Sequence, residues 1–81
     1  MNLSSTEITQ LVGLILGKRE VQAGQRLVED LGAESADIVN IIATLEEKYE
    51  IRIAESEIPK INTSDDLRRL VQALLNRKAS P

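Results

Sequence analysis

The 81-residue chain contains no cysteine and no histidine. Because cysteine is absent, the chain forms no disulfide bond and binds no metal ion through thiolates. Because histidine is absent, it lacks the commonest general base and the commonest metal ligand. A serine nucleophile would have no imidazole to accept its proton, so the composition argues against a hydrolase or a transferase. We therefore expect that the protein is not an enzyme.

Aromatic residues and long apolar runs are also scarce. Tyr49 is the only aromatic residue, so the core must be built from leucine, isoleucine, valine and alanine. No apolar run approaches the roughly 20 residues of a membrane-spanning helix, and no basic segment precedes the run LVGLIL as in a signal peptide. We expect one cytoplasmic domain over residues 1–81, monomeric and not inserted in a membrane.

Acidic residues are concentrated in the middle of the chain. The net charge is −3, but residues 29–57 carry nine acidic side chains against only Lys48 and Arg52. Such a negative field repels nucleic acid and attracts basic protein surfaces. We therefore expect no nucleic-acid partner, although a solvated helix surface would show the same charge pattern. The acidic residues between positions 29 and 37 lack the spacing of an EF-hand loop, so no metal site is expected.

The apolar pattern predicts helices and no sheet. Ser4 and Glu7 have the spacing of a capping box, Leu3 and Ile8 can close a hydrophobic staple, and Gly17 can end the first helix. A second helix is predicted from residue 35 or 36 to 49 or 50, and a short helical turn over 56–60. The last helix is predicted to open in the stretch NTSDD, where Thr63 or Ser64 can be its cap. The predicted fold is an all-α bundle of three principal helices and one short helix.

A long loop over residues 17–34 separates the first two predicted helices. Loops of this length are uncommon in small domains and are often functional. Leu27, Val28 and Leu31 are the residues expected to anchor it to the core, with a short helical turn inside it.

Ser35 lies where this loop becomes a helix, in the stretch LGAESADIV at residues 31–39. It can be a helix cap, a nucleophile or an attachment point. A capping serine hydroxyl contributes about 1 kcal/mol by accepting an orphan N–H. The nucleophile interpretation fails because the neighbouring carboxylates of Glu34 and Asp37 are too weakly basic and no lysine is near in sequence.

The residues around Ser35 favour attachment, because residues 27–53 resemble the acyl carrier proteins. That family has a hydrophobic residue, an acidic pair, Leu-Gly, and then Asp-Ser-Leu opening the second helix. The matching positions are Leu27, Glu29, Asp30, Leu31, Gly32, Ser35, Asp37, Val39, Leu45, Glu46, Glu47 and Tyr49. The segment IPKINTSDDLRRLV also resembles the family, so the likeness covers nearly the whole chain.

The resemblance implies a 4′-phosphopantetheine arm attached covalently to Ser35, with acyl groups held on it as thioesters. It implies a phosphopantetheinyl transferase as one partner, and acyl-transfer and synthase enzymes with basic patches as others, in fatty-acid, lipid or polyketide synthesis. The residues expected to bind partners are Glu34, Ala36, Asp37, Val39, Asn40, Ala43, Glu46, Glu47 and Glu50. A cleft sheltering the acyl chain is expected among residues that also form core, namely Ile38, Ile42, Leu45, Ile53, Ile61, Leu67 and Val71.

The sequence departs from the family pattern near the serine. Glu34 replaces the usual aspartate, Ala36 the usual leucine or methionine, and Ala43 an outward apolar residue that is often methionine. The apolar patch is therefore smaller, which predicts a specialised carrier with dedicated enzymes. Two alternatives stay open: an aminoacyl or peptidyl carrier of the same fold, and an unmodified acidic helical adaptor.

Overall fold

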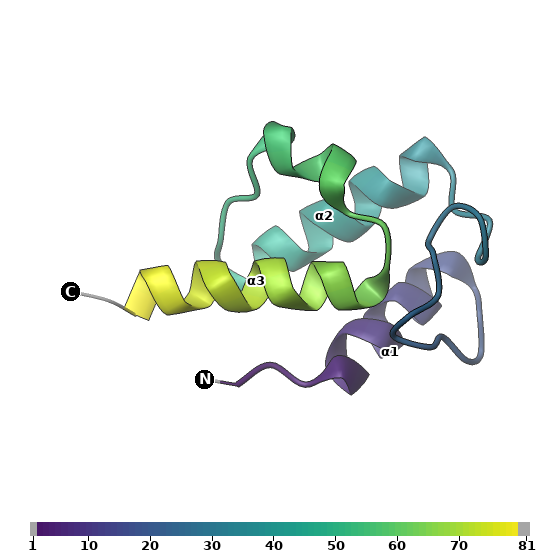
Figure 1. The fold of residues 1–81 in the computed structure, drawn as a ribbon, viewed down its shortest axis with the longest axis horizontal. Helices are drawn as coiled ribbons and strands as arrows, with labels where there is room; N and C mark the ends of the chain where they lie inside the picture. Colours follow the sequence, from purple (N-terminus) through teal and green to yellow (C-terminus); the bar gives the residue numbers. More distant parts are fainter. Residues whose placement is uncertain (1, 80–81) are drawn as a thin grey trace.

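Three α-helices and one 3₁₀-helix make up the fold of the described residues (Figure 1). The computed structural model describes residues 2–79. The α-helices are α1 (Ser5–Leu16), α2 (Ser35–Tyr49) and α3 (Ser64–Ala79), and the 3₁₀-helix η1 (Glu55–Lys60) joins α2 to α3. Each α-helix contacts the other two, and η1 lies on the side of α2 opposite to α1. The predicted all-α bundle with a long first loop is confirmed.

The ends of α1 follow from local sequence. The Ser4 hydroxyl accepts a hydrogen bond from the Glu7 N–H at 3.2 Å, and Leu3 and Ile8 are both buried beside this cap. The helix stops at Gly17, whose positive φ of 69° is a conformation that glycine adopts without a steric penalty. Both predicted boundaries of α1 are therefore confirmed.

The core is aliphatic and draws on every α-helix and on the long loop. Its completely buried members are Ile8, Val12, Leu27, Ile41, Leu45, Leu67 and Val71. Burying one such side chain contributes about 1.5–3 kcal/mol, so these few residues supply much of the driving force for folding. No helix within residues 2–79 is long and apolar enough to cross a membrane.

The long loop is held by a helical turn, as predicted, but one expected anchor is wrong. Leu27 and Leu31 are buried, whereas Val28 is 56% exposed. Hydrogen bonds from Asp30 N–H to the carbonyl of Arg26 and from Gly32 N–H to that of Val28 close the turn. Residues four apart in such a turn share a face, so Leu27 and Leu31 point inward together and Val28 points to solvent.

A salt bridge and a backbone pairing fix the same turn in place. The Arg26 guanidinium contacts the Asp30 carboxylate at 3.1 Å, and this hydrogen bond holds the pKa of Asp30 below its usual value. Leu27 N–H donates to the carbonyl of Asn62 at 2.8 Å, just before α3. The loop is therefore attached to the start of α3, and it delivers the chain to the start of α2.

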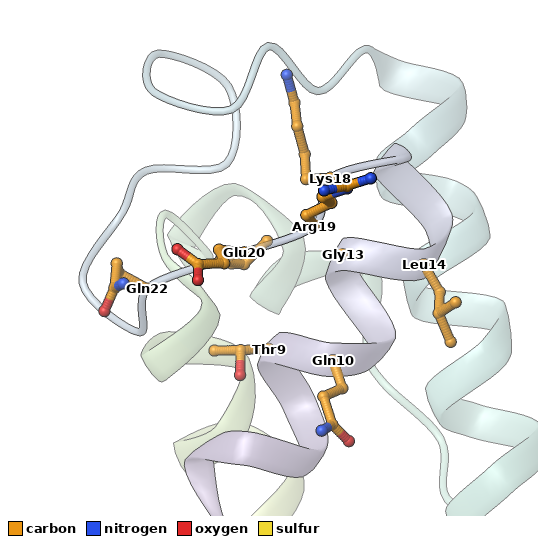
Figure 2. A pocket seen from close by; sticks show the side chains of 9 residues that line it. Thr9, Gln10, Gly13, Leu14, Lys18, Arg19, Glu20 and Gln22 are labelled. Carbon is orange, nitrogen blue, oxygen red and sulfur yellow. The ribbon is translucent and has the colours of Figure 1, made fainter.

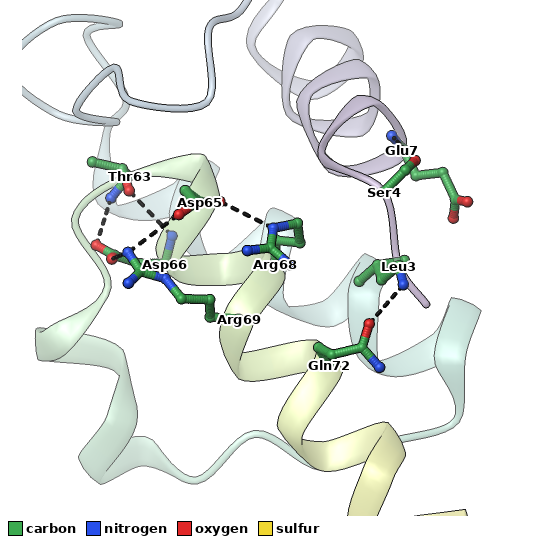
Figure 3. A network of polar contacts seen from close by, with 9 residues as sticks. All are labelled: Leu3, Ser4, Glu7, Thr63, Asp65, Asp66, Arg68, Arg69 and Gln72. Carbon is green, nitrogen blue, oxygen red and sulfur yellow. Dashed lines mark hydrogen bonds and ion pairs between the residues drawn. The ribbon is translucent and has the colours of Figure 1, made fainter. Parts of the chain in front are cut away.

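Polar contacts fix the start of α3 and the N-terminal segment (Figure 3). The Thr63 hydroxyl accepts the Asp66 N–H at 3.1 Å, and the Asp66 carboxylate accepts the Thr63 N–H at 3.0 Å. Thr63, rather than Ser64, is therefore the cap. Gln72 accepts the Leu3 N–H at 2.6 Å, which holds the chain before α1 against α3.

Candidate functional site

Ser35 is the first residue of α2, and its side chain is exposed. Within residues 2–79 its hydroxyl has no hydrogen-bond partner. The interpretation of Ser35 as the helix cap is therefore wrong. The N-cap is the preceding residue, Glu34, whose backbone is extended (φ −95°, ψ 170°). Only the residue before the helix can direct its side chain at the first free N–H groups. The Ser35 hydroxyl is consequently available to another molecule.

Serine is the first residue of all three α-helices, so local position alone does not single out Ser35. Ser5 and Ser35 are exposed, whereas Ser64 is 1% exposed and closed off from solvent. The sequence before each serine separates the two exposed ones. Both serines follow their own cap residues, Glu34 and Ser4, but only Ser35 also follows the turn that ends in Leu31-Gly32.

The turn before Ser35 presents it to solvent. Leu31 and Ala33 are buried on either side of Gly32, whose φ is +71°. Ala33 N–H donates to the Leu27 carbonyl at 2.9 Å, which completes the turn. The loop is therefore pinned to the core up to residue 33, and Glu34 and Ser35 are the first exposed residues after it. Any residue other than glycine would be strained at position 32, because it has a Cβ atom.

The start of α2 has two free backbone donors, Ser35 and Ala36, because Glu34 and Asp37 form a capping box with each other. Its first helical hydrogen bond runs from Ile38 N–H to the Glu34 carbonyl at 3.1 Å, so earlier N–H groups of the helix have no partner of this kind. The Asp37 carboxylate accepts the Glu34 N–H at 2.9 Å. These N–H groups and the positive end of the helix dipole favour an anion beside Ser35, which fits a phosphodiester at that hydroxyl.

The predicted partner-binding residues divide into two groups. Seven are exposed on α2 or at its ends: Glu34, Ala36, Val39, Asn40, Ala43, Glu47 and Glu50. Among them Val39 is a large apolar side chain that is 67% exposed. The other two are half-buried and have partners inside the chain, because Asp37 accepts the Glu34 N–H and Glu46 accepts the Ile53 N–H at 2.9 Å. The pattern of acidic residues gave no sign of these internal roles.

A groove of about 390 Å³ lies between α2 and η1. Of the predicted cleft residues, Ile38, Ile42 and Ile53 line it. Leu45, Leu67 and Val71 are instead completely buried in the core, and Ile61 lines a separate hollow beside α3. The groove also has walls that were not in the predicted cleft, namely Val39, Ala43, Glu46, Arg52, Glu55 and Ile58.

The acidic residues near Ser35 do not converge on one point. Asp30 is paired with Arg26, and Asp37 accepts a backbone N–H. Within the part of the chain that the structure describes, no three carboxylates are arranged to hold a metal ion. The described chemistry of the site is therefore an exposed hydroxyl at a helix N-terminus, beside an apolar groove.

Comparisons with known proteins agree with this geometry. The family model described as "Phosphopantetheine attachment site" matches residues 6–74. The acyl carrier protein of Wolinella succinogenes is 41% identical over 59 residues, which are 73% of this chain and 78% of that protein. The acyl carrier protein of Helicobacter hepaticus is 38% identical over 60 residues, 74% of this chain and 79% of that protein.

Solved structures share the fold. A Mycobacterium tuberculosis protein provisionally assigned as an acyl carrier protein is 30% identical, with a TM-score of 0.80 over 85% of this chain and 95% of its own. The acyl carrier protein of Thermotoga maritima is 25% identical, with a TM-score of 0.76 over 90% of this chain and 87% of its own. The chain therefore belongs to the acyl carrier proteins, a family of carriers rather than catalysts that bear a phosphopantetheine attachment site.

Proposed function

We propose that Ser35 is the attachment point of the 4′-phosphopantetheine arm in this acyl carrier protein. The observation that carries the proposal is the exposed Ser35 hydroxyl, which has no partner within residues 2–79 and stands at the start of α2. The arm, when attached, supplies a thiol, which this cysteine-free chain lacks. Acyl groups are held on that thiol as thioesters. The chain itself needs no general base for this role.

The residues around Ser35 suit a phosphodiester in three ways. The free N–H groups at the start of α2 favour a negative charge. The Asp37 carboxylate accepts a hydrogen bond from the Glu34 N–H, so this neighbouring anion already has a partner. The buried flanks of Gly32 hold the approach to Ser35 in one conformation, so a transferase meets a preformed turn.

The groove between α2 and η1 is the proposed shelter for the acyl chain. It begins at Ile38, one turn beyond Ser35, and continues along α2 to Glu46. Its volume of about 390 Å³ is within the usual range for small-ligand sites, roughly 300–1,000 Å³. Ile42, Ile53 and Ile58 provide the apolar wall that an alkyl chain needs. Leu45, Leu67 and Val71 would contribute only if the core opened.

The exposed acidic residues of α2 are the proposed contact for basic patches on a phosphopantetheinyl transferase and on acyl-transfer or synthase enzymes. Contacts between exposed charges form fast and weaken with salt, which suits a carrier that must release each partner. Ala36 and Ala43 leave only a small apolar contact around Val39, which favours dedicated partners. We further propose a cytoplasmic, monomeric protein with a single domain over residues 1–81 that catalyses no reaction.

Intact-mass measurement tests the attachment point. The protein is incubated with coenzyme A and a broad-specificity phosphopantetheinyl transferase. We expect the parent to gain one 4′-phosphopantetheinyl group and Ser35→Ala to gain none. The matched control is Ser5→Ala, which removes an exposed serine from the same position of α1. Modification of Ser35→Ala, or its loss in Ser5→Ala, would contradict the assignment.

A second variant separates a poor substrate from a chain that does not carry an arm. Glu34→Asp with Ala36→Leu restores the family pattern on both sides of Ser35. If the parent is not modified but the double variant is, Ser35 is an attachment point with its own transferase. If neither is modified, the unmodified adaptor becomes the better interpretation.

A further inference from the structure

Leu14 is the most exposed large apolar side chain within residues 2–79, with 84% of its surface accessible. It lies in the last turns of α1, on the opposite side from the completely buried Val12. A single exposed leucine is ordinary in a soluble protein. The surroundings of Leu14 are what make it unusual.

Leu14 and Gln10 stand between two surface hollows. The larger, of about 630 Å³, lies between α1 and the segment 18–22 (Figure 2). The smaller, of about 280 Å³, lies between α1 and α2, where Thr44 and Lys48 form its far wall. Both residues line both hollows, so Leu14 projects as an apolar knob with an accessible depression on each side.

Gly13 makes this surface shape possible. A Cβ atom at position 13 would lie only 2.9 Å from the Lys18 carbonyl oxygen, and the Lys18 N–H donates to the Gly13 carbonyl at 2.8 Å. The chain therefore folds back tightly against α1 immediately after the αL residue Gly17. This close approach places Lys18 and Arg19 at the rim of the larger hollow, which Leu14 also lines. In Figure 2 the Arg19 guanidinium lies toward Leu14, and the Lys18 ammonium extends outward from the rim.

Two basic side chains at this rim form no ion pair within the described residues. Lys18 and Arg19 are exposed and have no ion pair within residues 2–79, unlike Arg68 and Arg69 on α3, which contact Asp65. Glu20 also lines the larger hollow, but in Figure 2 its carboxylate lies on the side away from Leu14. Glu7 and Lys48, which have opposite charges, line the smaller hollow. Lys18 and Arg19 therefore leave the surface around Leu14 with a positive balance, in a protein whose net charge is −3.

We propose that Gln10, Leu14, Lys18 and Arg19, the α1 surface, form a second docking surface for a protein whose small apolar pocket is rimmed by carboxylates. Leu14 fills the pocket, and Lys18 and Arg19 face the rim. Charge complementarity favours this partner, because the basic α1 surface attracts an acidic protein. The acidic residues of α2 instead attract basic proteins. The two surfaces share no residue, so this partner and an enzyme acting at Ser35 need not compete for the same contacts.

Two other occupants fit less well. A membrane with anionic lipids would attract Lys18 and Arg19 but would be repelled by the acidic middle of the chain. A second copy could offer its acidic α2 to the α1 surface, but that contact would occupy the acidic residues of α2 that are proposed to meet partner enzymes. Both remain as outcomes of the test.

The test uses the full chain with a photoactivatable p-benzoylphenylalanine in place of Gln10, expressed in its native cells. Gln10 is exposed and lines both hollows beside Leu14, so the Leu14 side chain is kept. The same group in place of Val39 reports on the α2 side. The protein cross-linked from position 10 is identified and purified, and its affinity for the unlabelled parent is measured. We expect its cross-linked segment to contain aspartate or glutamate around apolar residues, and we expect it to differ from the proteins cross-linked from position 39.

Variants then decide whether the α1 surface carries the binding. Leu14→Ser and the double reversal Lys18→Glu with Arg19→Glu should each weaken the affinity about tenfold or more. Val39→Ser and Arg77→Glu, an exposed apolar change and an exposed charge reversal elsewhere, should change it less than about twofold. Phosphopantetheinyl transfer to Leu14→Ser should proceed as in the parent, which separates this proposal from the assignment of Ser35.

Three results would overturn the proposal. One is cross-linking from position 10 only to a second copy of the chain, together with association of the parent in sedimentation equilibrium. Another is Leu14-dependent binding of the parent to phosphatidylglycerol vesicles without a protein adduct. The third is no adduct from position 10 under conditions where position 39 gives one, or an adduct whose affinity is unchanged in both variants.

Discussion

The Tyr49 hydroxyl donates a hydrogen bond to the Glu7 carboxylate at 3.0 Å, and this contact joins the last residue of α2 to the first turn of α1. Tyr49 is the only aromatic residue of the chain, and its ring packs against the core. Burial, and then the hydrogen bond to Glu7, raise the pKa of Tyr49 to about 12. The two helices that flank the long loop are therefore joined by a titratable contact.

The stability of the protein should fall at high pH because of this contact. A folded-state pKa of about 12 lies above the usual 10.0, so the contribution of Tyr49 is complete below about pH 10 and is lost as the pH rises toward 12. Near-ultraviolet absorbance of the phenolate measures this directly. We expect titration near pH 12 in the folded protein and near pH 10 in urea. Equal midpoints in the two states would contradict the contact, and Tyr49→Phe, which has no phenolate, supplies the baseline.

Asp65 and Asp66 are neighbours with different roles, which makes them a matched pair (Figure 3). Both form ion pairs with Arg69, but only Asp66 accepts the backbone N–H groups of Asn62 and Thr63, at 2.9 and 3.0 Å. We expect Asp66→Ala to destabilise the fold by about 1–2 kcal/mol and Asp65→Ala by less than about 0.5 kcal/mol. Urea unfolding near neutral pH measures both. Equal losses would show that the ion pairs matter more than the cap.

The same aspartate also predicts the direction of an acid effect. Partial burial acts to raise the pKa of Asp66, but the N–H groups of Thr63 and Asn62 and the charge of Arg69 outweigh it and hold the pKa below its usual 3.8. Its contribution is therefore present above about pH 4 and is lost as the pH falls through the lower folded-state pKa. The stability difference between the parent and Asp66→Ala should shrink in that acidic range.

Ser64 is 1% exposed, and its hydroxyl oxygen has no hydrogen-bond partner within the described residues. A buried hydroxyl without a partner costs about 1–3 kcal/mol, so Ser64→Ala should leave the stability unchanged or raise it by about 1 kcal/mol. The urea midpoint of the variant measures the change. Ser5→Ala, at the exposed equivalent position of α1, should shift the midpoint little. A loss above about 1 kcal/mol in Ser64→Ala would mean that the hydroxyl has a partner in solution.

The helix boundaries could be predicted because they depend on nearby residues. Ser4 and Glu7 start α1, Gly17 ends it, and the apolar stripe of α2 gives its length. The position of Ser35 beside the start of α2 was predictable for the same reason. The identity of the cap was not, because a shift of one residue between Glu34 and Ser35 leaves the apolar stripe unchanged.

The remaining features depend on contacts between distant segments, which periodicity does not report. Val28 and Leu27 are equally apolar, and only the closed turn of the loop decides which of them is buried. The expected cleft likewise mixed Ile42, which lines the groove, with Leu45, which is sealed in the core one turn away. Which side of α2 remains open is set by where η1 packs.

Glu46 and Glu47 are adjacent acids that the sequence pattern places in one group, but the structure separates them. The Glu46 carboxylate accepts the Ile53 N–H at 2.9 Å and ties α2 to the segment before η1, whereas Glu47 is exposed and unpaired within residues 2–79. We expect Glu46→Ala to lower the stability by about 1–2 kcal/mol, because it leaves the Ile53 N–H without its acceptor. Glu47→Ala should lower it by less than about 0.5 kcal/mol.

Both substitutions remove one negative charge, so both should slow association with a basic phosphopantetheinyl transferase. The slowing should fade as the ionic strength rises, since exposed charges are screened over about 8 Å at physiological salt. Urea unfolding and stopped-flow association of the two variants therefore give different patterns: Glu47→Ala changes only the association rate, and Glu46→Ala changes both quantities. A stability loss in Glu47→Ala as large as that in Glu46→Ala would contradict the hydrogen bond to Ile53, and unchanged association in Glu47→Ala would remove Glu47 from the proposed partner surface.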